Sequence, residues 1–298
     1  QRRRQRQMCI RDRLNLFMTI INPGENILLP EPYFPLYGPD ATLVGGEAKY
    51  YPCLFDHEFI PQVADLEGLV DDRTVAILYN FPSNPTGGTL NEQQRDDLLA
   101  FAAKHDLWII SDEVYDRIVF ETEHVSFMGT GYDKLMVVNS FSKTFAMTGW
   151  RIGYIVSTNL EAMKQVVKIQ YYISACSNDA MQYAVLEAME KANDYPSMMA
   201  TEFQKRCKLI VDRLNAMPGV QCHQPKGSIY VFPKVDVPGM SSEDVALELL
   251  KDGVLCSPGS AFGPSGEGHL RFAYTIGQDD IVRGMDKVEA TLTRLQQG

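Results

Sequence analysis

The residue best placed to do chemistry in this sequence is one lysine in a turn rich in hydroxyl groups. Lys143 lies in the segment NSFSKTFAMTGWRIGYIV, between Ser142 and Thr144 and directly after a strongly apolar run. An arbitrary lysine is usually a solvated surface group. A lysine held in a partly desolvated site has a lowered pKa and becomes a nucleophile for carbonyl groups. Lys143 is therefore a candidate nucleophile.

A carboxylate and a possible anion site accompany this lysine. Asp112 closes the apolar run LWIIS, where an unpaired charge is costly, although a helix N-cap or a salt bridge is the alternative reading. Ser140, Ser142 and Arg151 supply hydroxyl and guanidinium groups suited to a phosphate. We expect Arg151 to be buried within GWRIGYIV, the alternative being a surface ion pair. A lysine, a carboxylate and a phosphate site are together what pyridoxal 5′-phosphate requires.

The elements that must position these groups read as buried strands. Apolar runs at 74–80, 107–113 and 134–142 alternate with helical patterns such as the amphipathic segment 91–106. This order predicts an α/β fold with a largely parallel sheet sandwiched by helices. Ligands of such sheets gather at the carboxyl ends of the strands. The polar residues after these three runs would then meet in one crevice, provided that the strands are neighbours.

The remaining pattern predicts a large domain over 14–195, followed over 196–298 by a linking helix and a smaller C-terminal α+β domain. Further expected elements are the end of a helix at 14–21, a short strand in NILLP, a loop in EPYFPLYG, a long helix at 196–217, and helices at 242–252 and 278–296.

Residues 1–13 differ from the rest of the chain. They carry six arginines against one aspartate, whereas the whole chain has a net charge of −10. A basic run can be a nucleic-acid arm or a targeting segment, but no apolar stretch follows it as in a secretory signal. We expect this stretch to be foreign to the protein.

Composition excludes several classes of function. The acidic balance disfavours nucleic acid as a partner, and no apolar stretch is long enough to span a bilayer. The histidines show no metal-ligand spacing, so we expect no metal site. The six cysteines are scattered without a CxxC pair, which indicates reduced thiols and a cytoplasmic protein.

Four motifs in order carry a family resemblance: NFPSNPTGGTL, SDEVYDRIVF, SFSKTFAMTGWRIGYIV and GHLRFAYT. From Leu14 to its C-terminus the chain resembles class I and II aminotransferases, the pyridoxal-phosphate enzymes of fold type I in the aspartate aminotransferase superfamily. Relatives have a longer N-terminal part, so the chain is expected to be truncated there. They also usually have a small-residue, Gly-Ala-like turn before LNLFM, where this chain has Asp12 and Arg13.

The resemblance implies a role for each matching residue. Lys143 matches the Schiff-base lysine and proton shuttle, and Asp112 matches the partner of the pyridine nitrogen. The other matches are Asn84 and Tyr115 at the ring hydroxyl, Ser140, Ser142 and Arg151 at the phosphate, Phe34 stacked on the ring, and Arg271, with Asn84, at the substrate carboxylate. The family often has cis peptides before the prolines of its motifs, so Glu31-Pro32 and Asn84-Pro85 are candidates.

The implied activity is transfer of an amino group from an L-amino acid (aspartate, aromatic or alanine-like) to a 2-oxo acid such as 2-oxoglutarate, in amino acid metabolism and biosynthesis. The family also implies a homodimer. Three alternatives stay open: a pyridoxal-phosphate-dependent C–S β-lyase, an aminotransferase-like effector domain of a transcription regulator, and an inert fragment. The intact NPTG motif favours an enzyme, since those regulators commonly alter it.

Overall fold

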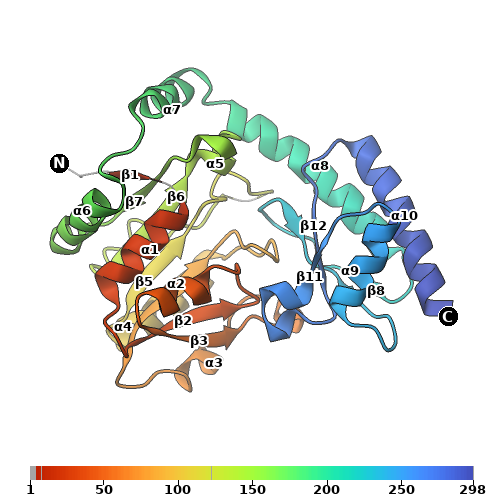
Figure 1. The fold of residues 1–298 in the computed structure, drawn as a ribbon, viewed down its shortest axis with the longest axis horizontal. Coiled ribbons are helices and arrows are strands. Elements are labelled where there is room, and N and C mark those ends of the chain that lie inside the picture. The colour runs from red at the N-terminus through yellow and green to blue at the C-terminus, as the bar shows by residue number, and fades with distance from the viewer. Residues whose placement is uncertain (1–4, 8, 122, 298) are drawn as a thin grey trace.

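A seven-stranded sheet forms the centre of the larger part of the molecule (Figure 1). The computed structural model describes residues 5–7, 9–121 and 123–297, with side chains from Arg13 onward. The strand order is β1-β7-β6-β5-β4-β2-β3. The strands are β1 (Gln5–Gln7), β2 (Asn26–Glu31), β3 (Glu47–Pro52), β4 (Thr74–Asn80), β5 (Trp108–Asp112), β6 (Leu135–Ser140) and β7 (Gly153–Val156).

The three strands predicted to carry the site are parallel neighbours. β4 pairs with β5, and β5 pairs with β6. Asn80 is the register partner of Asp112, so the last residues of β4 and β5 lie side by side. The α/β prediction with a largely parallel sheet is confirmed; β7 alone reverses direction, pairing antiparallel with both β6 and β1.

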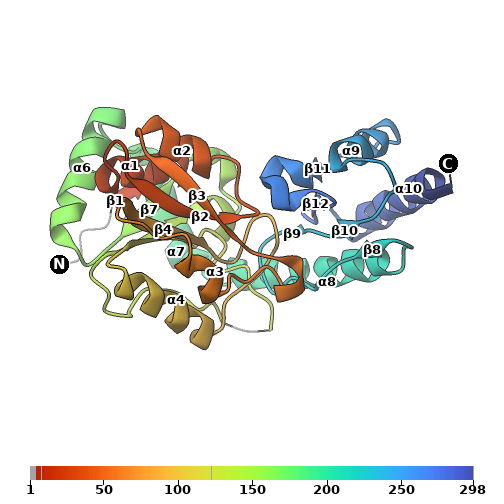
Figure 2. The same ribbon diagram turned by 90° about the horizontal axis from the view of Figure 1, so that it is seen from below.

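Helices cover both faces of this sheet (Figure 2). One face packs against α1 (Cys9–Ile20), α2 (Tyr37–Leu43) and α6 (Leu160–Ser174), and the other packs against α3 (Val63–Glu67) and α4 (Glu92–Lys104). In β4, Ala76 and Leu78 join the first core while Ile77 and Tyr79 join the second. This alternation explains why the sequence of β4 is almost continuously apolar: both of its faces are buried.

Local capping explains where the predicted helices begin. The helix expected at 91–106 is α4, whose N-cap Asn91 forms a capping box with Gln94. The loop expected over EPYFPLYG is too long, because α2 already begins at Tyr37. Pro39 hides this helix in the sequence, yet it falls in the first turn, where a missing amide hydrogen costs little.

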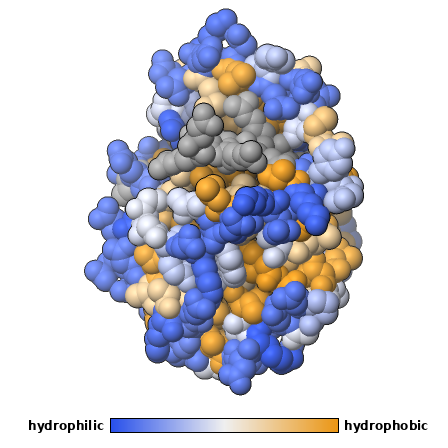
Figure 3. All heavy atoms as spheres, turned by 90° about the vertical axis from the view of Figure 1, so that its left-hand side faces the viewer, coloured by the Kyte–Doolittle hydropathy of each residue, from blue (hydrophilic) through white to orange (hydrophobic). Residues whose placement is uncertain are grey.

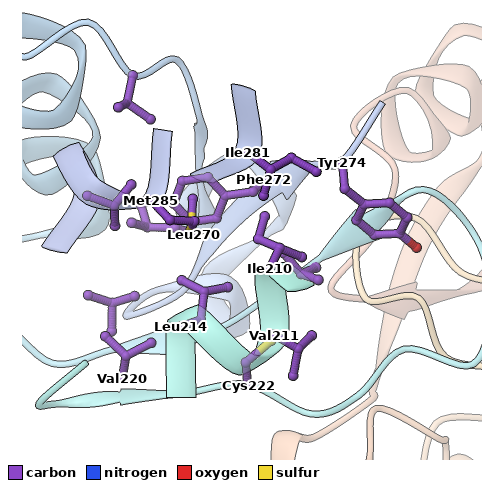
Figure 4. Close-up of a cluster of buried hydrophobic side chains, with 14 of the residues drawn as sticks. Ile210, Val211, Leu214, Val220, Cys222, Leu270, Phe272, Tyr274, Ile281 and Met285 are labelled. Atoms are coloured by element: carbon purple, nitrogen blue, oxygen red, sulfur yellow. The ribbon is translucent and has the colours of Figure 1, made fainter. Parts of the chain in front are cut away.

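The C-terminal part has its own core. The expected long helix is α8 (Tyr195–Asn215), which runs from the region of the large sheet to α10 (Figure 1). Leu214, Phe272 and Met285 belong to a buried cluster between α8 and the last elements of the chain (Figure 4). Those elements are β8 (Val220–Gln221), β9 (Tyr230–Val231), β10 (Lys234–Val235), α9 (Ser242–Lys251), β11 (Ser257–Pro258), β12 (Leu270–Ala273) and α10 (Gln278–Gln297).

The remaining elements are the helix α7 (Asp179–Lys191), the short helix α5 (Phe141–Thr144), and the 3₁₀ helices η1 (Phe55–His57), η2 (Thr148–Trp150), η3 (Gly259–Phe262) and η4 (Pro264–Gly266). Both expected cis bonds, Glu31-Pro32 and Asn84-Pro85, are present, together with Phe81-Pro82. The division into 14–195 and 196–298 and the foreign origin of residues 1–13 stay predictions.

Within the described residues, no helix has the length and apolar character needed to cross a membrane. The same part of the chain contains no group of three or more metal-ligating side chains. The five cysteines whose side chains are described are all free thiols.

Candidate active site

A cavity of about 180 Å³ lies at the carboxyl ends of β4, β5 and β6. Seven of the residues singled out in the sequence line it: Phe34, Asn84, Asp112, Tyr115, Ser142, Lys143 and Arg151. The other lining residues are Arg13, Tyr37, Asn80, Val114, Thr148 and Tyr230. Residues more than a hundred positions apart in the sequence therefore meet here because parallel strands end side by side.

Asp112 is the buried acid of this cavity. Only 3% of the residue is exposed. Its Oδ2 accepts a hydrogen bond from the Tyr37 hydroxyl at 3.0 Å and another from Arg13 at 3.4 Å. No described residue donates a well-formed hydrogen bond to Oδ1. Burial raises the pKa of the Asp112 carboxyl, and the charge of Arg13 and the Tyr37 hydroxyl act in the opposite direction. Such a carboxylate is suited to a further cationic donor.

Glu113, the residue after Asp112, anchors the end of β5 through hydrogen bonds to its carboxylate. The Glu113 carboxylate accepts hydrogen bonds from the hydroxyls of Ser111 and Ser126 at 2.8 and 2.7 Å. A ring nitrogen of His124 lies 2.9 Å away, and the Phe127 amide donates at 3.2 Å. These bonds fix the backbone that carries Asp112, which keeps its carboxyl directed into the cavity.

Arg13 shares the cavity with Asp112. It is buried, and its guanidinium lies 5.0 Å from the centre of the Phe34 ring and 5.1 Å from that of Tyr37. Its Nε is 3.7 Å from the Asp40 carboxylate. Burial raises the pKa of Asp40 to about 6, although Arg13 acts to lower it. A planar cation thus lies against an aromatic face and beside a buried acid.

Asn80 joins the NPTG loop to the end of β5. Its side-chain amide donates to the backbone oxygen of Asp112 at 3.0 Å, and its Oδ1 accepts from the Asn84 amide at 3.0 Å. Because both bonds are buried, breaking either would leave an unpaired polar group. Asn80 therefore sets the position of Asn84 relative to Asp112.

The turn after β6 presents Lys143. Ser140 is the N-cap of α5: its hydroxyl accepts from the Ser142 amide at 3.1 Å and donates to the Ile152 carbonyl at 3.0 Å. Lys143 is half-buried, and its Nζ lies 5.7 Å from the centre of the Tyr115 ring. The amine therefore lies beside the ring of Tyr115 in the cavity.

One expectation about this turn needs correction, and another stays a prediction. The Ser140 hydroxyl caps α5 and Ser140 is not among the residues that line the cavity, but its expected role at a phosphate stays a prediction. Arg151 lines the cavity but is exposed rather than buried. It has a left-handed backbone (φ +56°) and donates to the Thr148 carbonyl at 2.6 Å, so the backbone turns away from the buried strand at this residue.

Arg271 reaches the site from the C-terminal part. Its guanidinium donates to Asn84 Oδ1 at 2.9 Å and to the Ser257 hydroxyl at 3.1 Å. It does not line the 180 Å³ cavity itself, but Asn84 does. Burial lowers the pKa of Arg271, and the neighbouring Tyr230 and Tyr115 raise it. Arg271 is therefore a cation of the C-terminal part that contacts, through Asn84, the part built on the large sheet.

Six residues that line the cavity were not predicted as site residues from the sequence, and Tyr37, Asn80 and Tyr230 are three of them. Asn80 carried a usable signal, since it is the polar last residue of an apolar strand, like Asp112. Tyr37 lies in the aromatic segment that also holds Phe34. Tyr230 carried no signal, because its position depends on the pairing of two short strands far apart in the sequence.

The donor set fits a phosphorylated pyridine aldehyde. Asp112 Oδ1 is a buried acceptor with capacity for a ring N–H, and Lys143 offers an amine in the same cavity. Ser142, Thr148 and Arg151 line it with hydroxyl groups and a guanidinium suited to a phosphate. Phe34 offers an aromatic face, which Arg13 now contacts. A ring that packed against Phe34 and met Asp112 would compete with the Arg13 guanidinium for both residues.

Comparison with known proteins agrees with this geometry. Residues 12–288 match the family described as aminotransferase class I and II. An aspartate aminotransferase of Pyrococcus abyssi is 35% identical over 278 residues, covering 91% of this chain and 71% of the relative. Aromatic-amino-acid aminotransferase 2 of Thermococcus litoralis is 34% identical, covering 92% of this chain and 72% of the relative. The crystal structure of an aromatic aminotransferase from Pyrococcus horikoshii superposes with a TM-score of 0.94 at 33% identity, covering 98% of this chain and 80% of that one.

Proposed function

The chain belongs to the class I and II aminotransferase family, and from this membership we propose that its cavity holds pyridoxal 5′-phosphate and exchanges amino groups between an L-amino acid and a 2-oxo acid. The proposed amino donors are aspartate, aromatic or alanine-like amino acids, with 2-oxoglutarate as an acceptor. Relatives named as aspartate and aromatic-amino-acid aminotransferases support the first two classes.

One observation carries this proposal: the buried carboxylate of Asp112, whose Oδ1 has no well-formed hydrogen bond among the described residues although the Val114 amide acts on the carboxyl, lies in the same cavity as the half-buried amine of Lys143. A buried charge without full pairing is costly, so such an arrangement is typical of a binding site rather than of a structural core. Asp112 ends β5 and Lys143 follows the neighbouring strand β6, so their place in one cavity is a consequence of the sheet.

When bound, pyridoxal phosphate supplies an aldehyde that bonds amines and a pyridinium ring that withdraws electrons. In the proposed arrangement Asp112 keeps the ring nitrogen protonated, which a buried anion does more strongly than one in water. Lys143 would hold the aldehyde, and once the substrate amine has taken its place its free amine would move the proton at the substrate Cα. Its half-buried position beside the Tyr115 ring keeps the amine in the cavity.

The remaining proposed roles divide between the two ends of the ligand. Asn84 and Tyr115 hydrogen-bond the ring hydroxyl, and Phe34 packs against the ring. Ser140, Ser142 and Arg151 would hold the phosphate, and Ser140 also caps α5. Arg271 holds the substrate carboxylate in a bidentate manner that lysine cannot reproduce, and its bond to Asn84 aligns it beforehand.

We also propose that the protein is a cytoplasmic homodimer. Tyr171, Tyr172 and Tyr183, on α6 and α7, are 68%, 79% and 71% exposed. Tyr171 and Tyr172 therefore lie outside the core. Figure 3 views the end of the molecule that carries α6 and shows apolar side chains exposed among polar ones. Exposed aromatic groups of this kind are enriched at protein interfaces, and the free thiols support a reducing compartment.

Absorbance spectroscopy tests the proposed function. Adding pyridoxal phosphate to the wild-type protein should produce a visible band that is missing in Lys143→Ala. Lys251→Ala is the matched control, because that lysine lies on α9 and its side chain is 69% exposed. An equal band in Lys143→Ala and in the control would contradict the role of Lys143.

A second assay identifies the reaction. The loaded protein is mixed with single amino acids, and conversion of the band together with formation of the matching 2-oxo acid is expected for aspartate, aromatic or alanine-like donors. Restoration of the band by 2-oxoglutarate completes the transfer. Pyruvate and ammonia from a β-substituted amino acid, without such restoration, would instead identify a lyase.

A further inference from the structure

The guanidinium of Arg271 lies between two aromatic rings. Its central carbon is 4.3 Å from the centre of the Tyr230 ring and 4.6 Å from that of Phe262. The register of β9 and β12 explains the first contact: Tyr230 lies opposite Ala273, so Arg271, two residues away, is its diagonal neighbour on the same face. Arg271 is thus held by the face of Tyr230 as well as by its hydrogen bonds to Asn84 and Ser257.

The hydroxyl of Tyr230 faces a different part of the site. It lies 3.4 Å from the hydroxyl of Tyr115, and the two rings meet edge to face at 6.0 Å and 78°. Tyr115 is buried, and Lys143 lies over its ring. Tyr230 also lines the 180 Å³ cavity. One side chain therefore touches both the residue proposed for the substrate carboxylate and the residue proposed for the ring hydroxyl of the cofactor.

We propose that Tyr230 is a positioning residue that couples these two ends of the site: its ring holds Arg271 ready for the substrate carboxylate, and its hydroxyl orients the hydroxyl of Tyr115. This inference rests on the function proposed above, because it uses the roles given there to Arg271 and Tyr115.

The hydroxyl part follows from donor counting. A tyrosine hydroxyl has one proton to donate and can accept two hydrogen bonds. In the structure Tyr115 donates to Tyr230. When an anionic ring oxygen enters the cavity, Tyr115 turns its proton to that oxygen and Tyr230 donates to Tyr115 in its place. Each hydrogen bond in such a chain polarises the next one, so the hydroxyl of Tyr230 makes the Tyr115 hydroxyl a stronger hydrogen-bond donor.

The ring part follows from burial. Removing a guanidinium from water disfavours its charge, and burial does lower the pKa of Arg271. The negative faces of Tyr230 and Phe262 offset part of that loss. They also restrict the guanidinium to one plane, so less rotamer freedom is lost when a carboxylate binds.

Three variants separate these effects. Tyr230→Phe keeps the ring and removes only the hydroxyl. Tyr230→Leu removes both. Phe262→Leu removes the other ring that contacts Arg271 and leaves both hydroxyls in place, so it is the matched control for the hydroxyl.

The first measurement follows the visible band of the protein loaded with pyridoxal phosphate as a function of pH. Losing one hydrogen bond that supports the ring oxygen should raise the pH midpoint of the band by about 0.5 unit or more in Tyr230→Phe. The midpoint of Phe262→Leu should equal that of the wild type. A Tyr230→Phe midpoint equal to that of the wild type would overturn the role of the hydroxyl.

The second measurement needs no cofactor. Calorimetric titration of the unloaded protein with the unreactive carboxylate 3-phenylpropionate should give about tenfold weaker binding in Tyr230→Leu and in Phe262→Leu, and nearly unchanged binding in Tyr230→Phe. Wild-type affinity in Tyr230→Leu would overturn the role of the ring. A wild-type protein without a visible band contradicts the proposed function instead, and the titration still decides the role of the ring.

Discussion

Replacing Arg13 should lower the free energy of unfolding of the protein without cofactor and at the same time increase its affinity for pyridoxal phosphate. Arg13 is buried against two carboxylates, 3.4 Å from Asp112 and 3.7 Å from Asp40. Removing one partner of a buried ion pair costs roughly 3–5 kcal/mol when the other stays charged. Both carboxyls have raised pKa values, that of Asp40 to about 6, so protonation relieves part of this cost and we expect about 2 kcal/mol at pH 8.

The pH dependence of this loss has a definite sign. Without the charge of Arg13 the folded-state pKa values of Asp40 and Asp112 rise further above their unfolded values. A raised carboxyl pKa favours the folded state at low pH, and this contribution is lost as the pH rises through the folded pKa. The difference in thermal midpoint between Arg13→Met and the wild type should therefore be large at pH 8 and small at pH 5.

Cofactor binding supplies the second half of this test. Arg13→Met keeps an apolar stem but frees the space beside Asp112 and Phe34, so its Kd for pyridoxal phosphate at pH 8 should fall about tenfold, equivalent to roughly 1.4 kcal/mol. Arg13→Lys is the control that keeps a charge near Asp112. Equal midpoints and an equal Kd in Arg13→Met and the wild type would show that Arg13 neither stabilises the two carboxylates nor obstructs the cofactor.

Three further predictions concern the support of the site. Asn80→Ala breaks two buried hydrogen bonds and should weaken pyridoxal phosphate binding about fivefold or more in an absorbance titration, whereas an unchanged Kd would deny its positioning role. Gly259→Ala places a Cβ inside contact distance of the Gly266 carbonyl and should lower stability by about 2 kcal/mol; Gly284→Ala, which meets open space, should not lower it. Burial lowers the pKa of His269 below 6.5, so its contribution to stability is complete above pH 6.5 and falls as the pH drops. The free energy of unfolding, measured by denaturation between pH 5 and 7, should therefore depend less on pH in His269→Phe than in the wild type.

The parts of the site carried by regular strands could be predicted from the sequence. Fully buried parallel strands give short apolar runs, and the polar residue that ends each run marks the ligand edge of the sheet. This reasoning brought Asp112 and Lys143 together, and the order of β4, β5 and β6 confirms its premise. The helices α4, α9 and α10 were equally accessible through their amphipathic pattern and capping residues.

The parts that depend on turn geometry or on tertiary pairing could not be predicted. Arg151 follows a short 3₁₀ helix and has a positive φ, so an apolar neighbourhood in the sequence did not imply burial. The place of Ser140 at the N-cap of α5 was also not evident from its residue type. Tyr230 meets Arg271 only because β9 and β12 pair. These contacts depend on how segments far apart in the sequence are placed in space, and the pattern of one sequence does not specify that placement.

The most direct test of the account is to identify the lysine that bonds pyridoxal phosphate. The protein is treated with the cofactor, reduced with borohydride so that the bond to the amine becomes permanent, and digested for peptide mass spectrometry. We expect a pyridoxyl adduct on Lys143 that is lost when Asp112→Ala removes the carboxyl from the same cavity. Adducts spread over exposed lysines, with Lys143 unmodified in the wild-type protein, would contradict the claim that neighbouring strand ends bring these two groups into one site.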